Sequence, residues 1–132
     1  MITRDGPLLT VLGAVAIGAV LGAWLRWALS YWLNPRVVHL PLGTLAANLI
    51  GGYLIGVAVA AFAAHPSISP FWRLALITGF LGGLTTFSTF SAESVVLLQG
   101  EHWRSAATHV LAHLGGSLLA TVAGIATYRA LG

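Results

Sequence analysis

Charged residues and cysteine are what this sequence has least of. Only 7% of its 132 residues are charged, and cysteine is absent. Soluble domains carry about 25% charged residues, so the composition excludes an ordinary soluble protein and favours a membrane protein. The lack of cysteine excludes disulfides, thiolate chemistry and cysteine-based metal sites. A net charge of +3 is too small and too scattered to indicate a nucleic-acid partner.

Apolar residues, by contrast, make up 58% of the chain and fall into four uncharged runs. The runs are Leu8–Leu25, Leu42–Ala64, Leu74–Ala92 and Ser105–Tyr128. Each approaches or exceeds the roughly 18 residues that indicate a transmembrane helix. We therefore expect an all-α membrane protein with a single transmembrane domain over residues 1–132. Its four transmembrane helices are predicted at about residues 8–33, 42–64, 72–98 and 105–130.

The basic residues divide almost evenly between the two sides of such a four-span chain. One side holds Arg4, Arg73 and Arg129, and the other holds Arg36 and Arg104, with Arg26 near the end of the first span. The Lys/Arg bias of short loops sets orientation. A bias near zero favours insertion both ways, and two opposite copies can then pair as an antiparallel dual-topology homodimer. The alternative is that a small bias and other factors fix one orientation.

The third run contains a polar, glycine-rich interruption, Gly79–Ser91. Gly82 and Gly83 each lower helix propensity by about 1 kcal/mol, and the hydroxyls that follow compete with the helical ladder. The pattern predicts a broken third helix. Because lipid cannot hydrogen-bond a free backbone, the break must face protein or a watery cavity. Unwound carbonyls commonly bind Na⁺, and the N–H groups that open the next half-helix favour anions.

The second run carries Asn48 on a face of small residues that repeats every four positions: Thr44, Asn48, Gly52 and Gly56. The Asn48 side chain either makes an interhelical hydrogen bond worth roughly 1 kcal/mol or donates hydrogen bonds to an anion or to water. In the interrupted run, Phe87 and Phe90 can share one helical side. They either contact lipid and core or present positive ring edges to an anion.

The fourth run carries a polar stripe of His109, His113 and Ser117. The two histidines could relay protons or bind a metal. No acidic or cysteine partner stands at ligand spacing in the sequence, so a metal is the weaker interpretation. Glu93 is either buried and functional or placed near the aqueous end of its span.

Two strings, Gly43–Gly51 (GTLAANLIG) and Gly82–Ser91 (GGLTTFSTFS), resemble the Fluc (CrcB) family of fluoride channels. The length and four-span plan match over essentially the whole chain. The resemblance implies a multi-pass protein of a prokaryotic-type plasma (inner) membrane. It also implies an antiparallel homodimer in the lipid bilayer, with two pathways for passive export of cytoplasmic fluoride. In this family, hydroxyls of Tyr and Ser line the fourth span, where this chain has His109 and His113.

The resemblance also implies roles for particular residues. The fluoride pathway would comprise Asn48, Phe87, Phe90, Thr86, Ser88, Thr89, Ser117 and Arg26. The backbone carbonyls of Gly82 and Thr85 would bind a structural Na⁺ at the centre of the dimer.

Three other classes of protein fit the sequence less well. A small multidrug-type cation/proton antiporter also has four short spans, but it needs an acid deep in its first span, and Leu8–Leu25 has none. A subunit that serves only for helix packing, through the pairs Gly18/Gly22 and Gly52/Gly56, leaves the interruption unexplained. An enzyme is not expected, because no nucleophile–base constellation is present.

Overall fold

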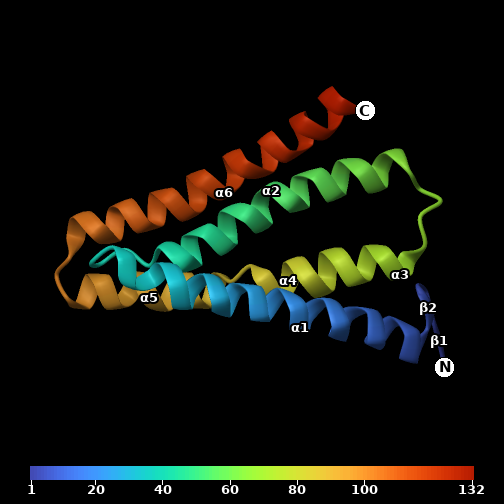
Figure 1. Ribbon diagram of the computed structural model, residues 1–132, viewed down its shortest axis with the longest axis horizontal. Helices are drawn as coiled ribbons and strands as arrows, with labels where there is room; N and C mark the ends of the chain where they lie inside the picture. The colour runs from blue at the N-terminus through green and yellow to red at the C-terminus, as the bar shows by residue number, and fades with distance from the viewer.

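The computed structural model describes residues 1–132 and consists of four long helical segments. They are α1 (Leu8–Leu33), α2 (Leu42–Ala64), the composite third segment Pro70–Gln99, and α6 (Trp103–Leu131). All four are long and apolar enough to cross a membrane, which confirms the predicted four-helix membrane class. The N- and C-termini lie toward the same end of the molecule (Figure 1).

Several short elements complete the chain. They are the hairpin strands β1 (Ile2–Thr3) and β2 (Gly6–Pro7), the 3₁₀ turn η1 (Asn34–Arg36), and, within the third segment, α3 (Pro70–Arg73), the π-helical η2 (Leu74–Leu81), α4 (Gly82–Leu84) and α5 (Phe87–Gln99). The η1 turn is connected to α2 by Asn34, whose Oδ1 accepts the Gly43 N–H at 2.7 Å. This bond occupies one of the donors that every helix N-terminus leaves free.

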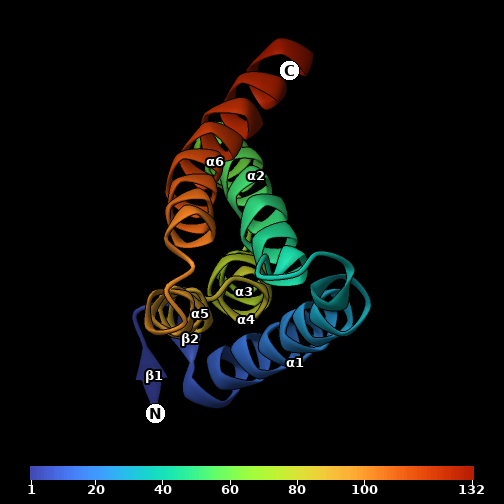
Figure 2. The ribbon, with the colours of Figure 1, turned by 90° about the vertical axis from the view of Figure 1, so that its left-hand side faces the viewer.

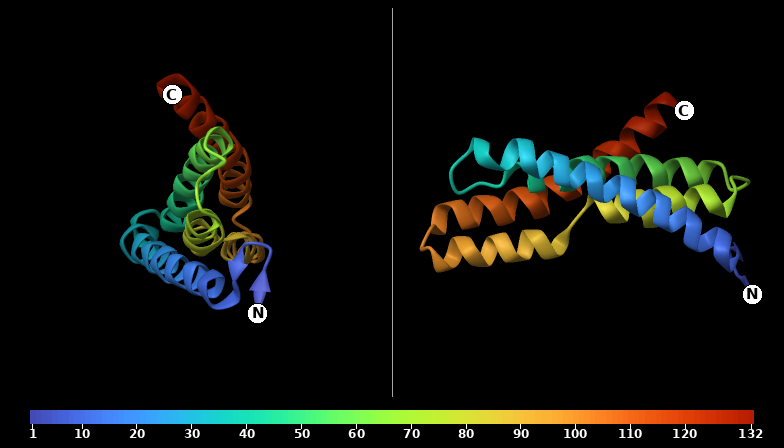
Figure 3. Two further views of the ribbon diagram at one scale, coloured as in Figure 1. Left: turned by 90° about the vertical axis from the view of Figure 1, so that its right-hand side faces the viewer. Right: turned by 60° about the horizontal axis from the view of Figure 1, so that its bottom comes forward.

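The backbone of the third segment is extended at two residues between α4 and α5. Thr85 has ψ 153°, and Thr86 has φ −150° and ψ 118°. The extended link is visible in the right-hand view of Figure 3. Beyond it, Thr86 caps α5, because its side-chain oxygen accepts the Thr89 N–H at 3.1 Å.

Glycines allow the helices to pack closely (Figure 2). A Cβ atom added to Gly22 of α1 would meet the carbonyl oxygen of Phe80 in η2, and one added to Gly56 of α2 would meet that of Thr121 in α6. Such close contacts are typical of membrane helices, which associate through small residues. The glycine pairs singled out in the sequence therefore pack helices within one chain.

The interior is correspondingly small. Ala47, Leu81 and Leu84 form the buried apolar cluster, at the level of the extended link. Many large apolar side chains on α1 and α6 are exposed, such as Leu111 and Leu118. Lipid is as apolar as a protein interior, so exposed apolar side chains are expected on membrane helices. The buried polar residues all lie on α2, α5 and α6, and they are Thr44, Ser94, His109 and His113.

Candidate functional site

Asn48 of α2 is bonded twice to the extended link. Its Oδ1 accepts the Thr86 N–H at 2.7 Å, and its Nδ2 donates to the Thr86 carbonyl at 3.0 Å. The amide oxygen therefore replaces the helical acceptor that the break removes from the Thr86 N–H, while the Thr86 carbonyl, at the N-cap of α5, gains the amide N–H as a second donor. An unpaired backbone group is costly in lipid, so Asn48 explains how an extended residue can lie inside a membrane span.

The same bonds leave two carbonyl oxygens without their usual donors. In a continuous α-helix the Thr86 N–H would bond to the Gly82 carbonyl, four residues earlier. Here that N–H is donated to Asn48. The Thr89 N–H would likewise bond to the Thr85 carbonyl, but it is donated to the Thr86 side chain. The carbonyls of Gly82 and Thr85 are thus available to other partners, and Gly82 is exposed.

The two phenylalanines at the start of α5 lie edge to face. Their ring centroids are 5.3 Å apart with an interplanar angle of 62°. Phe90 is 7% exposed and also lies against the rings of His109 and His113, whereas Phe87 is 72% exposed. One ring is therefore held in place by its neighbours, and the other stands at the surface of the single chain.

A hollow of about 470 Å³ adjoins the link, and we call it the central hollow. Its polar lining includes Asn48, Thr85, Thr86, His113 and Ser117, and both phenylalanines also line it. Five of the predicted pathway residues are thus brought together here: Asn48, Thr86, Phe87, Phe90 and Ser117.

The remaining predicted residues lie around this hollow rather than along it. The Thr86 hydroxyl contacts the hydroxyls of Ser88 at 3.3 Å and Thr89 at 3.1 Å. Arg26 of α1 donates its Nε–H to the Gly83 carbonyl at 3.0 Å. Arg26 does not line the central hollow, and its part in a pathway stays a prediction.

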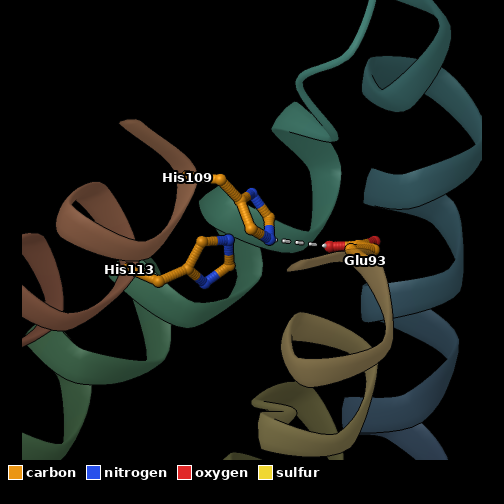
Figure 4. Close-up of side chains that lie close together, drawn as sticks. All are labelled: Glu93, His109 and His113. Atoms are coloured by element: carbon orange, nitrogen blue, oxygen red, sulfur yellow. Dashed lines mark ion pairs between the residues drawn. The ribbon is translucent and has the colours of Figure 1, made fainter. Parts of the chain in front are cut away.

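A cluster of three ionisable side chains lies beside Phe90, and sequence reasoning did not connect them. The Nε2 atom of His109 is 3.4 Å from Oε2 of Glu93. Ring centroids of His109 and His113 are 4.4 Å apart. Figure 4 shows the two rings and the carboxylate turned toward one another. Thr44 donates its hydroxyl hydrogen to the other Glu93 oxygen at 2.6 Å.

The interpretation that the two histidines lack an acidic partner is therefore wrong. Potential ligand atoms of Glu93, His109 and His113 all lie within 4.8 Å of one another. Glu93 is 16 residues from His109 in the sequence, so linear spacing could not reveal this group. The repeat of His109 and His113 at i and i+4 was the only sequence signal. The packing of α5 on α6 supplies the acid.

A second hollow, of about 390 Å³, has Glu93 in its lining and shares no lining residue with the central hollow. Asn34, His39 and Pro41 line it from the α1–α2 connection, and Glu93 and Val96 line it from α5. We call it the outer hollow. The cluster thus has the central hollow next to His113 and the outer hollow next to Glu93.

Four lipid-facing helices around a polar, hydrogen-bonded link define a small multi-pass integral membrane protein with an internal polar site. Residues 13–125 match the model of the family described as CrcB-like protein, Camphor Resistance (CrcB), and the chain belongs to this family. The resemblance in Gly43–Gly51 and Gly82–Ser91 is thereby confirmed.

Curated relatives of the chain carry the name Fluoride-specific ion channel FluC. One from Cupriavidus metallidurans is 59% identical over 118 residues, which is 89% of this chain and 94% of the relative. One from Albidiferax ferrireducens is 63% identical over 114 residues, 86% of this chain and 87% of the relative. One from Ralstonia pickettii is 61% identical over 117 residues, which is 88% of this chain and 92% of the relative. These relatives are named as ion channels, and the four membrane-length helices of this chain agree with a multi-pass integral membrane protein.

Proposed function

We propose that this protein is a fluoride-selective channel that exports cytoplasmic fluoride passively, down its own gradient. The proposal is supported by relatives of 57–63% identity that are named fluoride-specific channels. The observation that carries it within the chain is the Asn48–Thr86 contact, which holds an extended, polar stretch of backbone inside a membrane span.

The chemistry of the central hollow suits a small, strongly hydrated anion. Such an ion must exchange its water for close hydrogen-bond donors, and it must still be released. The Ser117 hydroxyl is a neutral donor. The Asn48 amide and the Thr86 hydroxyl can also donate to an anion when they release a present acceptor, which is the Thr86 carbonyl or His113 for Asn48 and Thr89 for Thr86. The edges of Phe87 and Phe90 add a weak positive potential. Neutral groups attract fluoride without the full fixed charge that would hold it too tightly.

Other hydroxyls and one cation extend this proposed pathway. Ser88 and Thr89 contact Thr86 and can pass the anion to and from it. Arg26, about two turns before the end of α1, would act as a fixed positive charge that raises the local concentration of anions.

We further propose that two copies associate in antiparallel orientation around a Na⁺ ion. The carbonyls of Gly82 and Thr85 fit such an ion, because both have lost their helical donors and unwound carbonyls are typical Na⁺ ligands. Two carbonyls from one chain cannot surround a cation, whereas two chains related by a two-fold axis supply a complete set. Bound Na⁺ would offset the partial charges of these oxygens and hold the two chains together.

The function is tested by fluoride efflux from liposomes that contain the purified protein. We expect rapid efflux down a fluoride gradient, measured with a fluoride electrode, and no comparable loss of chloride. A multidrug-type antiporter would instead couple uptake of an organic cation to a proton gradient. Coupled cation uptake without fluoride efflux would contradict the proposal.

A further inference from the structure

Three buried polar atoms of one cluster make no hydrogen bond, although two of them, Glu93 Oε2 and His109 Nε2, lie 3.4 Å apart. They are Oε2 of Glu93, Nε2 of His109 and Nε2 of His113. His109 is 2% exposed and His113 is 3% exposed, so bulk water does not reach them. Buried polar atoms almost always have a partner. Three unpaired atoms that converge therefore indicate one shared partner.

We propose that Glu93, His109 and His113 form a binding site for a divalent transition-metal ion of the Zn²⁺ class. The two histidines lie one helical turn apart on α6, the spacing by which helical histidine pairs bind zinc. The third ligand, Glu93, comes from α5. Two histidines and one glutamate are the protein ligands of several zinc sites that leave a fourth position open.

The distances suit such an ion. A tetrahedral site with bonds of about 2.0 Å has edges of about 3.3 Å between its ligand atoms. The Glu93 and His109 atoms are 3.4 Å apart, and all three ligand atoms lie within 4.8 Å.

The charge of the site also favours a cation. Glu93 is 18% exposed and its only ion pair in the structure is with His109. A carboxylate inside a membrane span needs a positive partner. Nitrogen ligands favour Zn²⁺ and its neighbours, whereas Na⁺, Mg²⁺ and Ca²⁺ prefer oxygen.

Metal binding must compete with the Asn48–Thr86 contact. Asn48 Nδ2 lies 3.0 Å from Nδ1 of His113, and its two bonds to Thr86 fix the amide so that NH₂ faces the ring. Because NH₂ can only donate, Nδ1 accepts and the neutral ring carries its hydrogen on Nε2. A metal at Nε2 places that hydrogen on Nδ1, and the Asn48 amide then has to turn. A carboxylate at position 48 would accept the Nδ1 hydrogen instead and strengthen metal binding.

The position of the cluster implies an effect on conduction, and this part rests on the proposed function. His113 lines the central hollow and Glu93 lines the outer hollow. A metal ion bound to both residues would therefore lie between the two hollows. The outer hollow gives the ion a way in. A bound metal would turn Asn48 and occupy space beside Phe90, and we expect it to block fluoride in that subunit.

Binding is tested on the purified natural protein with Co²⁺ as the probe, because tetrahedral Co²⁺ absorbs strongly in the visible range. We expect a visible band with wild-type protein that Zn²⁺ abolishes. Glu93→Gln, His109→Gln and His113→Gln should each lose the band, and Asn48→Asp should bind Co²⁺ about 10-fold more tightly. Circular dichroism and size-exclusion chromatography show which variants fold.

The matched control is the pair of exposed His39 and half-buried His102, whose rings stack with centroids 3.7 Å apart. The double variant His39→Gln/His102→Gln should keep the band. If wild-type protein gives no band, or if only the control variant loses it, the site is overturned and a water or proton satisfies the three atoms.

A second measurement separates this proposal from the proposed function. Zn²⁺ should lower fluoride efflux through wild-type protein and leave efflux through folded His109→Gln unchanged. A Co²⁺ band with Zn²⁺-insensitive efflux would overturn the block while keeping the metal site. Absence of fluoride efflux without any metal would contradict the channel, and the Co²⁺ band would still decide the site.

Discussion

Asn48 and Thr86 exchange two hydrogen bonds across 38 residues of sequence, at 2.7 Å and 3.0 Å. The amide both accepts from and donates to the backbone of the link. Asn48 thus has a structural task, and its Nδ2 also contacts His113. Both N–H groups of the Asn48 amide are engaged, one by the Thr86 carbonyl and one by His113 Nδ1, so Asn48 donates to an anion only by releasing one of these acceptors.

Substitutions of Asn48 separate these two tasks. Asn48→Leu should abolish fluoride efflux and destabilise the protein by about 1–3 kcal/mol, because it leaves the Thr86 N–H unpaired. Asn48→Asp keeps an acceptor for the Thr86 N–H but loses the amide donors. We therefore expect a smaller loss of stability than in Asn48→Leu, together with little fluoride efflux. Thermal unfolding and liposome efflux measure the two quantities. Normal efflux in folded Asn48→Leu would exclude Asn48 from the pathway.

Substitution of Phe87 and of Phe90 should change protein stability by different amounts but lower fluoride efflux in the same way. Phe90→Ile should cost about 1.5 kcal/mol, since that ring is buried, whereas Phe87→Ile should cost less in the single chain. If ring edges attract fluoride, both variants should lower efflux sharply while the dimer still forms. Phe62→Ile is the control, because Phe62 on α2 contacts Arg73 away from the hollow. Unchanged efflux in both test variants would contradict the proposed role of the rings.

If the proposed Na⁺ site exists, thermal stability and fluoride efflux should both depend on Na⁺. This dependence should remain when the Thr85 hydroxyl is removed. Replacing all Na⁺ with a bulky organic cation should lower thermal stability and efflux. Thr85→Val keeps the carbonyl and the methyl group that lies against Gly51, and it loses only the bond to the Leu81 carbonyl. We expect a cost of about 1 kcal/mol and an unchanged Na⁺ dependence. A Thr85→Val protein that no longer responds to Na⁺ would point to the side chain as the ligand.

The near-zero basic bias predicts both orientations in the membrane. Since the chain has no cysteine, a single cysteine added after Gly132 gives a clean label. An impermeant thiol reagent should reach about half of the labels in intact cells, by the dual-topology expectation. Two lysines inserted beside Arg36 should force one orientation and remove function. A single orientation of the natural sequence would refute the antiparallel dimer.

Close packing of α1 on the third segment predicts a strong position effect among glycines. Gly22→Ala should destabilise by at least about 1–3 kcal/mol, because the new methyl group meets the Phe80 carbonyl. Gly13→Ala on the same helix meets no atom within 4 Å and should be neutral or slightly stabilising. Denaturation in detergent compares the two. Equal stabilities would mean that α1 packs elsewhere.

The span-forming helices were predictable because they depend on local properties. Any run of some 20 apolar residues must form a helix in lipid, where backbone groups have no other partners. The glycine and hydroxyl residues of Gly79–Ser91 marked the place where the backbone becomes extended at Thr85 and Thr86. The i and i+4 pattern likewise placed His109 and His113 on one helical face.

Contacts between helices could not be predicted in the same way. Nothing in the linear sequence states which residue pairs with the Thr86 backbone, or that Glu93 lies 3.4 Å from His109. These contacts depend on helix rotation and on the distance of approach. Glycines such as Gly22 and Gly56 set that distance, and their effect appears only when the partner helix is in place.

The sequence by itself determined the membrane class, the number of spans and the family, because hydrophobic length and short local motifs fix them. Only the tertiary structure decided which polar side chains share a site. It joined Asn48 to the link and Glu93 to the two histidines, since buried polar groups must find partners wherever packing brings them.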